Sequence, residues 1–247
     1  MRFPRSAGIL LHPTALPGRF GIGEIGEPAF RFVDFLVESG QTLWQILPLG
    51  PTGYGDSPYA CFSAAAGNPL LINLEWLQAE GDVSSEDLAQ APKFPEATVD
   101  FGRVISFKTA VLHRAARNFR KHADDERKQA FEDFCTDNRI WLEDFALFMA
   151  LKEAHGGAVW NTWEWELASR QPEALEAWRE RLDEAVYAHC YFQYQFFRQW
   201  GELKQYANEH GIQIIGDIPI FVAYDSADIW ANPELFKLDE NRLPTVV

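Results

Sequence analysis

The fold is decided near the N-terminus, where residues 7–47 read AGILLHPTALPGRFGIGEIGEPAFRFVDFLVESGQTLWQIL. The continuous apolar run over residues 7–11 predicts a short strand buried on both faces. Residues 42–47 predict a second strand of this kind. Between them, Pro28 suits the first turn of a helix that Gly40 ends. Because strand, helix and strand in this order form a βαβ unit, we expect a parallel sheet with a right-handed crossover.

The second strand leads into a long loop, residues 50–69, which is rich in Gly and Pro. Loops of this length inside a compact domain are usually functional or disordered, and the prolines favour order. Aromatic rings can stack on the face of a pyranose while carboxylates and hydroxyls hydrogen-bond its hydroxyl groups. Tyr54, Asp56, Ser57 and Tyr59 are therefore candidate sugar-binding residues. The alternative is a rigid structural loop whose tyrosines cover the core.

Length, composition and charge restrict the class of protein. A chain of 247 residues with 47% hydrophobic residues can form one large or two small domains. A net charge of −14 argues against binding to nucleic acid or to an anionic membrane surface. Three widely spaced cysteines argue against a disulfide framework or a zinc site. We find no signal peptide or membrane-spanning segment, so a cytoplasmic protein is expected.

The middle of the chain predicts helices rather than strands. Apolar residues at three- and four-residue spacing favour helices over residues 106–122, 126–155 and 173–210. Sheet signals return at residues 212–216, which are followed directly by Asp217. A carboxylate just beyond a parallel strand lies on the carboxyl face of the sheet, which carries the active site in α/β barrels. Asp217 is therefore a candidate functional residue, with a cap on the following turn as the alternative.

Two other motifs are better explained by structure than by function. Gly21, Gly23 and Gly26 match GxGxxG, but they do not directly follow the first strand and no acidic residue ends the second. The hypothesis that the chain is a dinucleotide-binding oxidoreductase rests on this match alone. The aromatic segment over residues 160–166, WNTWEWE, is expected to pack rather than to bind a ligand. Among the histidines, His12 alone falls on a candidate carboxyl-end loop.

Several blocks together resemble a known family. They are GILLHPT with LPG and GIG (residues 8–23), WQILPLGPT (44–52), GDIPIFVA (216–223) and DSAD (225–228). In this order they are similar to blocks of the amylomaltases, the bacterial 4-α-glucanotransferases that also include the plant disproportionating enzymes. The resemblance spans the chain and is closest at its two ends.

The resemblance implies an α/β fold, a (β/α)8 TIM barrel of the α-amylase type with an inserted helical subdomain. It implies three parts: the first barrel strands with the substrate loop (residues 1–79), the mainly helical insert with a barrel helix (80–210), and the third strand with its loop (211–247). Only the first strands of the barrel are expected here, so the barrel is incomplete.

The resemblance also implies roles for residues. The family moves part of an α-1,4-glucan to another glucan with retention, which requires two carboxylates about 5 Å apart. Asp217 matches the acid at the end of the third barrel strand, and Ser57 and Tyr59 match positions near the same sugar. Tyr54 matches a tyrosine of a second glucan site, where Phe101 replaces the tyrosine of some relatives.

The family's nucleophile and acid/base have no counterpart up to Val247, so we expect them in the other half of the barrel and assign no catalytic residue here. The implied partners are maltooligosaccharides and the missing C-terminal half of the barrel. Neither a metal nor an organic cofactor is suggested. A glucan-binding domain without catalysis is the alternative function.

Overall fold

The computed structural model describes residues 5–245, apart from the side chain of Tyr54. The described chain forms two compact units, and each is built from three segments of sequence. The first contains residues up to Leu49, 67–123 and 195–218. The second contains residues 50–66, 124–194 and those from Pro219 onward.

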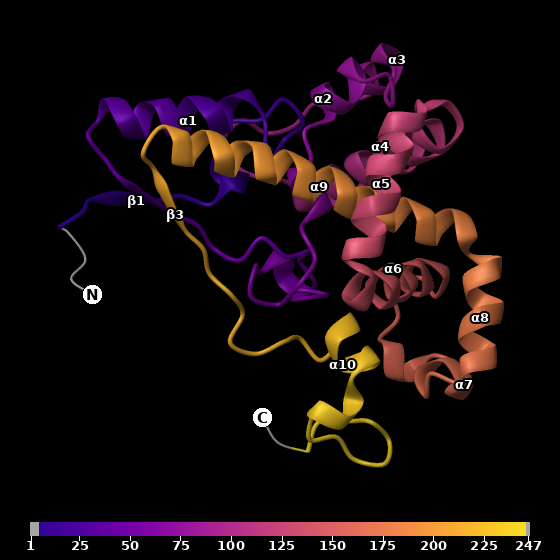
Figure 1. Ribbon diagram of the computed structural model, residues 1–247. Coiled ribbons are helices and arrows are strands. Elements are labelled where there is room, and N and C mark those ends of the chain that lie inside the picture. Colours follow the sequence, from indigo (N-terminus) through magenta and orange to yellow (C-terminus); the bar gives the residue numbers. More distant parts are fainter. Residues whose placement is uncertain (1–4, 246–247) are drawn as a thin grey trace. The chain divides into compact units, whose positions relative to one another are not determined.

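Most elements are helical, and Figure 1 labels the main ones. The first unit contains, in chain order, β1 (Gly8–Leu10), η1 (Pro13–Ala15), α1 (Glu27–Glu38), β2 (Leu43–Gln45), η3 (Pro69–Leu71), α2 (Leu74–Ala79), α3 (Ser85–Ala89), α4 (Phe101–His122) and β3 (Gln213–Ile215). The second contains η2 (Tyr54–Asp56), α5 (Asp125–Asp137), α6 (Arg139–Ala154), η4 (Trp160–Thr162), α7 (Trp165–Ala168), α8 (Pro172–Arg181), α10 (Ala227–Ala231) and η5 (Pro233–Leu235). The long helix α9 (Asp183–Glu209) contributes residues to both units.

The sheet of the first unit has three parallel strands in the order β1-β2-β3. Its register places Ile9, Trp44 and Ile214 in one row across the sheet. The helix α1 begins with Pro28 in its first turn and ends before Gly40, whose φ of 71° needs glycine. These features confirm the predicted βαβ unit and parallel sheet.

The two faces of this sheet differ in burial, which corrects the expectation of strands buried on both faces. Trp44 is fully buried, and its ring meets Phe32 of α1 edge-on at a centroid distance of 5.1 Å. On the opposite face, Leu10 and Ile215 are 55% and 42% exposed. Alternate residues of a strand point to opposite faces, so α1 covers only the face that carries Trp44.

Helix α1 packs along the C-terminal part of α9, and the two run side by side in Figure 1. The hydroxyl of Tyr206 donates to the Asp34 carboxylate at 2.6 Å, and the Tyr206 ring lies 5.1 Å from that of Phe30. The contact fixes the helix that leads into β3, and therefore the position at which β3 begins.

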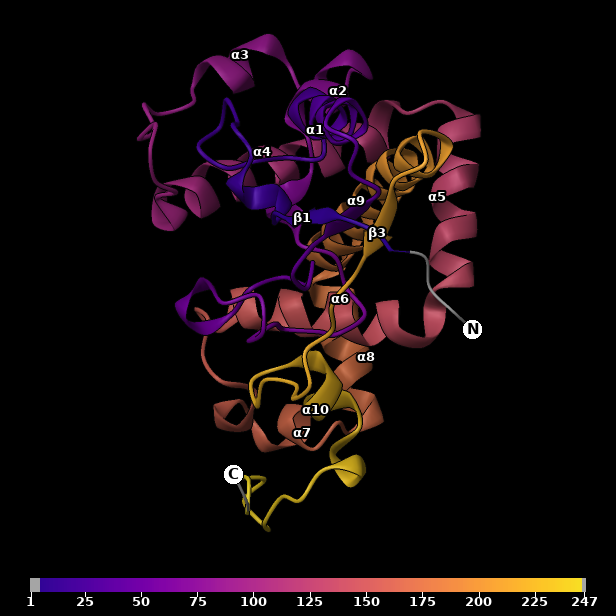
Figure 2. The same ribbon diagram turned by 90° about the vertical axis from the view of Figure 1, so that its left-hand side faces the viewer.

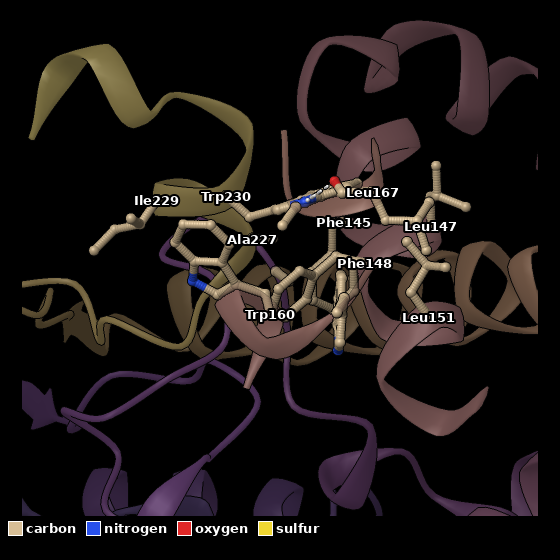
Figure 3. Packing of buried hydrophobic residues seen from close by; sticks show 12 residues of the cluster. Phe145, Leu147, Phe148, Leu151, Trp160, Leu167, Ala227, Ile229 and Trp230 are labelled. Carbon is tan, nitrogen blue, oxygen red and sulfur yellow. Dashed lines mark hydrogen bonds between the residues drawn. The ribbon is translucent and has the colours of Figure 1, made fainter. Parts of the chain in front are cut away.

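The second unit has its own aromatic core. Trp230 of α10 is fully buried against α6 and α7, and its indole N–H donates to the Leu167 carbonyl at 3.1 Å. Figure 2 shows α10 beside α7, and Figure 3 shows the cluster around Trp230 from close by. Trp160 and Trp163 belong to the same buried cluster, whereas Trp165 is 59% exposed. The expectation that the 160–166 segment packs is confirmed for its first two tryptophans.

Two of the predicted helices are each divided in two. The helix expected over residues 126–155 breaks at Asn138, where α5 ends and α6 begins. The Asn138 side chain donates to the Phe134 carbonyl at 2.9 Å and competes with the helical backbone. The helix expected over 173–210 breaks at Leu182, after which acidic residues occupy the first turn of α9. Apolar spacing continues across both breaks, so it does not reveal them.

The described chain is thus a mixed α/β structure that is mostly helical and contains a small parallel sheet. Over residues 5–245, none of the helices has the length and apolar character needed to span a membrane.

Candidate functional site

The long loop after β2 folds back on itself within the second unit. Thr52 and Cys61 form an antiparallel bridge. Inside the bridge, the Gly53 amide donates to the Ala60 carbonyl at 2.7 Å. We call residues 53–60 the loop tip. Backbone groups therefore close the tip at its base.

Two consecutive residues of the loop tip have left-handed backbone angles. Gly55 has a φ of 71° and Asp56 a φ of 53°. Positive φ is uncommon for a residue other than glycine, and such strain gathers at functional sites. The turn brings Asp56, Ser57 and Tyr59 together at one end of the loop.

The side chains of the loop tip differ in their exposure to solvent. Tyr59 is 47% exposed, and its amide donates to Ser57 Oγ at 3.3 Å. Asp56 and Ser57 are half-buried. The structure therefore groups three of the four predicted loop residues, while the side chain of Tyr54 lies outside the described residues.

The segment that begins α10 anchors the loop. The Ala227 amide donates to the Phe62 carbonyl at 2.8 Å, and the Ala64 amide donates to Asp228 Oδ2 at 2.9 Å. The Ser63 side chain also hydrogen-bonds Asp228. Burial raises the pKa of Asp228, and its hydrogen bonds oppose that shift. A carboxylate that receives a loop amide in this way orders the loop behind its tip.

A second anchor comes from the last turn of α6. Lys152 is largely buried, and its ammonium lies 2.6 Å from Asp225 Oδ2 and 5.1 Å from the centre of the Phe62 ring. It therefore joins α6, the chain before α10 and the loop. Sequence reasoning assigned no role to Lys152 or Asp228. The DSAD block contained Asp228, but nothing in the sequence singles out Lys152.

The predicted residues at the carboxyl ends of the strands lie in the first unit. Asp217 is exposed two residues beyond β3, and its Oδ1 accepts from the Ile218 amide at 2.8 Å. This local hydrogen bond agrees with a capping role and leaves Asp217 accessible to solvent. His12 follows β1 and contacts the Pro48 carbonyl at 3.3 Å and Thr14 Oγ1 at 2.6 Å. Burial lowers the pKa of His12, which favours a neutral imidazole.

Phe101 begins α4 and packs, partly buried, against a cluster that includes Ile22 and Leu70 in the first unit. The packing gives Phe101 a structural role. Its contribution to a second glucan site stays a prediction.

The glycines of the GxGxxG match have packing roles. A Cβ on Gly23 would collide with the Pro13 carbonyl, and one on Gly26 with the Asn73 side chain. Glu24, between them, is buried and forms an ion pair with Lys108. A buried carboxylate at this position would repel a pyrophosphate. Among residues 5–245, no cluster of His, Cys, Asp and Glu side chains is arranged to hold a metal ion.

The architecture is that of an α/β protein in which loops after parallel strands carry the candidate residues. The family model described as 4-alpha-glucanotransferase matches residues 11–242. The chain belongs to this 4-alpha-glucanotransferase family.

Its relatives carry the same description. The chain is 53% identical to a 4-alpha-glucanotransferase of Synechocystis over 235 residues. These matched residues are 95% of this chain and 46% of the relative. Identity to the enzyme of Thermus thermophilus is 52% over 247 residues, which is 100% of this chain and 49% of the relative. The chain thus spans about half the length of the curated relatives it matches.

Two solved structures of amylomaltases are similar to this chain. Amylomaltase from Streptococcus agalactiae, solved in complex with acarbose, superposes with a TM-score of 0.92 at 44% identity, over 97% of this chain and 48% of that one. Amylomaltase from Corynebacterium glutamicum matches with a TM-score of 0.70 at 17% identity over 92% of this chain and 32% of that chain, which shows the shared fold.

Proposed function

We propose that this chain forms part of a cytoplasmic 4-α-glucanotransferase, which transfers α-1,4-glucan segments between maltooligosaccharides by a retaining double displacement. The observation that carries the proposal is the match of nearly the whole chain to enzymes with this name at more than 50% identity. The acarbose complex of the Streptococcus agalactiae relative supports a carbohydrate ligand.

In this proposal the loop tip binds the glucan. The exposed ring of Tyr59 stacks on a pyranose face, and Asp56 and Ser57 hydrogen-bond its hydroxyls. Tyr54 contributes to a second glucan site, and Asp217 binds near the bond that is cleaved. These assignments draw support from the solvent access of Tyr59 and from the position of Asp217 beyond a parallel strand.

We further propose that the sheet is the first part of a (β/α)8 barrel. Helix α1 covers one face of the sheet, while Leu10 and Ile215 leave the other face open. In such barrels helices cover the outside and side chains from every strand fill the interior. The remaining strands would then come from the C-terminal half, which is also the proposed partner.

The chemical step is assigned to that other half. A retaining mechanism needs a carboxylate nucleophile and an acid/base about 5 Å apart. Asp56, Asp217 and Asp225 are not assigned either role, because each is accounted for by binding or by contacts within its own unit. The chain would thus bind glucan without converting it when the partner half is absent.

The test is incubation with maltotriose, with the 247-residue chain alone and with a chain extended to the length of the relatives. The extended chain should release glucose together with longer maltooligosaccharides, while the 247-residue chain should release neither. Absence of transfer by the extended chain would contradict the proposed activity. Transfer by the 247-residue chain would contradict the assignment of catalysis to the other half.

A further inference from the structure

Helices α5 and α9 meet through aromatic rings in the second unit. The ring of Phe131 lies 5.1 Å from that of Tyr187 and 5.7 Å from that of Tyr194. Phe134 adds a further contact to Tyr194 at 5.8 Å. These contacts define the faces that the two helices turn toward each other.

Two cysteines lie on the same faces. Cys135 follows Phe131 by four residues, and Cys190 lies three residues after Tyr187 and four before Tyr194. Residues at these spacings share one side of a helix. The two thiols hydrogen-bond each other, and each side chain is only partly buried. They are thus adjacent in space and accessible to a small reagent.

The hydrogen bond makes the two thiols unequal. The hydrogen bond to Cys190 lowers the pKa of Cys135, against the opposing effects of burial and of Glu132. The same hydrogen bond and burial raise the pKa of Cys190, where Glu143 acts in the same direction and Arg179 opposes it. The thiolate is the reactive form of cysteine, so Cys135 is the better nucleophile and Cys190 is placed to react second.

We propose that Cys135 and Cys190 form a reversible disulfide when the protein meets a peroxide. The sulfur of Cys135 attacks one peroxide oxygen, so that an S–O bond forms, the O–O bond breaks and hydroxide leaves. The sulfur of Cys190 then attacks the sulfenic sulfur, and the S–S bond forms as the S–O bond breaks. The sulfenic hydroxyl leaves as water with the proton of Cys190, and the hydroxide of the first step takes up the proton that Cys135 released when it ionised. Two thiols and hydrogen peroxide thus give one disulfide and two waters.

The third cysteine is unsuited to this chemistry. Cys61 is 1% exposed, and burial and the nearby Asp228 raise the pKa of its thiol. A buried, protonated thiol reacts slowly with peroxide. It therefore serves as an internal control.

The experiment treats the 247-residue chain with hydrogen peroxide and follows thiol titration, intact mass and the non-reducing peptide map. Of the three thiols, we expect two to disappear, the mass to fall by two hydrogen atoms, and one cross-link to join Cys135 to Cys190. Reduction with dithiothreitol should restore all three thiols. Retention of all thiols, a cross-link to Cys61, or addition of oxygen without a cross-link would overturn the proposal.

Matched variants separate the folded site from random oxidation. Cys61→Ser should form the same disulfide, whereas Cys190→Ser should leave a sulfenic acid on Cys135 that dimedone traps. In urea, the wild-type chain should give a mixture of cysteine pairings. The same mixture without urea would show that the fold does not direct the reaction, and would also overturn the proposal.

Discussion

At the scale of single residues, Glu24 and Lys108 form a fully enclosed ion pair in the first unit. Lys108 also donates to the Ile72 carbonyl at 2.7 Å, and Asn73 donates to Glu24 at 3.0 Å. Burial raises the pKa of Glu24 and lowers that of Lys108, and the attraction between them opposes both shifts. The pair joins the glycine-containing segment to α4.

Removal of one member of this pair should be more harmful than removal of both. Lys108→Met leaves a buried carboxylate without its counter-charge, and we expect a loss of about 3–5 kcal/mol in the free energy of unfolding. Combining it with Glu24→Leu should recover much of this loss. Urea denaturation measures the free energy of unfolding of the single and the double variant. Lys121→Met, on the exposed face of α4, is the control. A double variant no more stable than the single one would contradict this interpretation.

The sequence indicated part of this arrangement. The position of the GxGxxG glycines, which do not directly follow the first strand, already argued against a nucleotide site, and the structure confirms that the segment packs. Lys108, the partner of Glu24, could not be predicted, because it lies in the middle of a helix far along the chain, where lysine is usually solvated. The candidate residues Asp56, Ser57 and Tyr59 could be grouped from sequence because one short turn contains them all.

At the scale of elements, the anchor between the loop and α10 should depend on pH. Burial raises the pKa of Asp228 from the ordinary value of 3.8. The folded chain therefore retains a proton that the unfolded chain releases. The contribution of Asp228 to the free energy of unfolding should fall as the pH rises from 3.8 through the raised pKa that Asp228 has in the folded chain.

Asp228→Asn tests this dependence, because asparagine keeps an oxygen for the Ala64 amide but cannot ionise. Relative to wild type, it should gain stability as the pH rises from about 3.8 towards neutrality. Asp228→Ala should lose stability throughout, since it removes the acceptor. Denaturation at several pH values provides the comparison. A difference between Asp228→Asn and wild type that does not change with pH would contradict the assignment.

The core of the second unit predicts a contrast between two tryptophans. Trp230→Ala removes a fully buried ring and should cost about 3–5 kcal/mol of the free energy of unfolding. Trp165→Ala removes a ring that is 59% exposed and should cost less than about 1 kcal/mol. Chemical denaturation distinguishes them, and equal losses would show that the cluster is not the core of this unit.

Elements were predicted with uneven success for a physical reason. The strands and α1 have strong local signals: apolar runs, a proline at the helix start and a glycine after its end. The break at Asn138 depends on one side chain inside a continuous apolar pattern, and nothing in that kind of pattern marks the break at Leu182. Backbone competition by one side chain is too local for periodicity to detect.

At the scale of the whole chain, each unit combines segments that are distant in sequence. Such interleaving depends on long-range contacts, which linear patterns do not contain. The division at residues 79 and 210 stays a prediction. The same is true of a complete barrel, since the described sheet has three strands.

The outer strands β1 and β3 predict self-association of the chain. Outer strands offer unpaired backbone groups to other chains, and a charged side chain discourages this pairing. Ile215→Lys on β3 should therefore reduce association with increasing concentration, as measured by sedimentation velocity. Ile140→Lys is the matched control, because Ile140 is 94% exposed on α6. An equal effect of both substitutions would indicate that charge alone, rather than the sheet edge, controls association.

The central claim is that the loop tip binds a glucan, and calorimetric titration of maltooligosaccharide into the chain tests it most directly. Tyr59→Ala should weaken binding about tenfold, as loss of a stacking contact worth about 1.4 kcal/mol requires. Tyr59→Phe keeps the ring and should bind within about threefold of wild type. Circular dichroism should show all three chains equally folded. Unchanged binding by a folded Tyr59→Ala chain would contradict the claim.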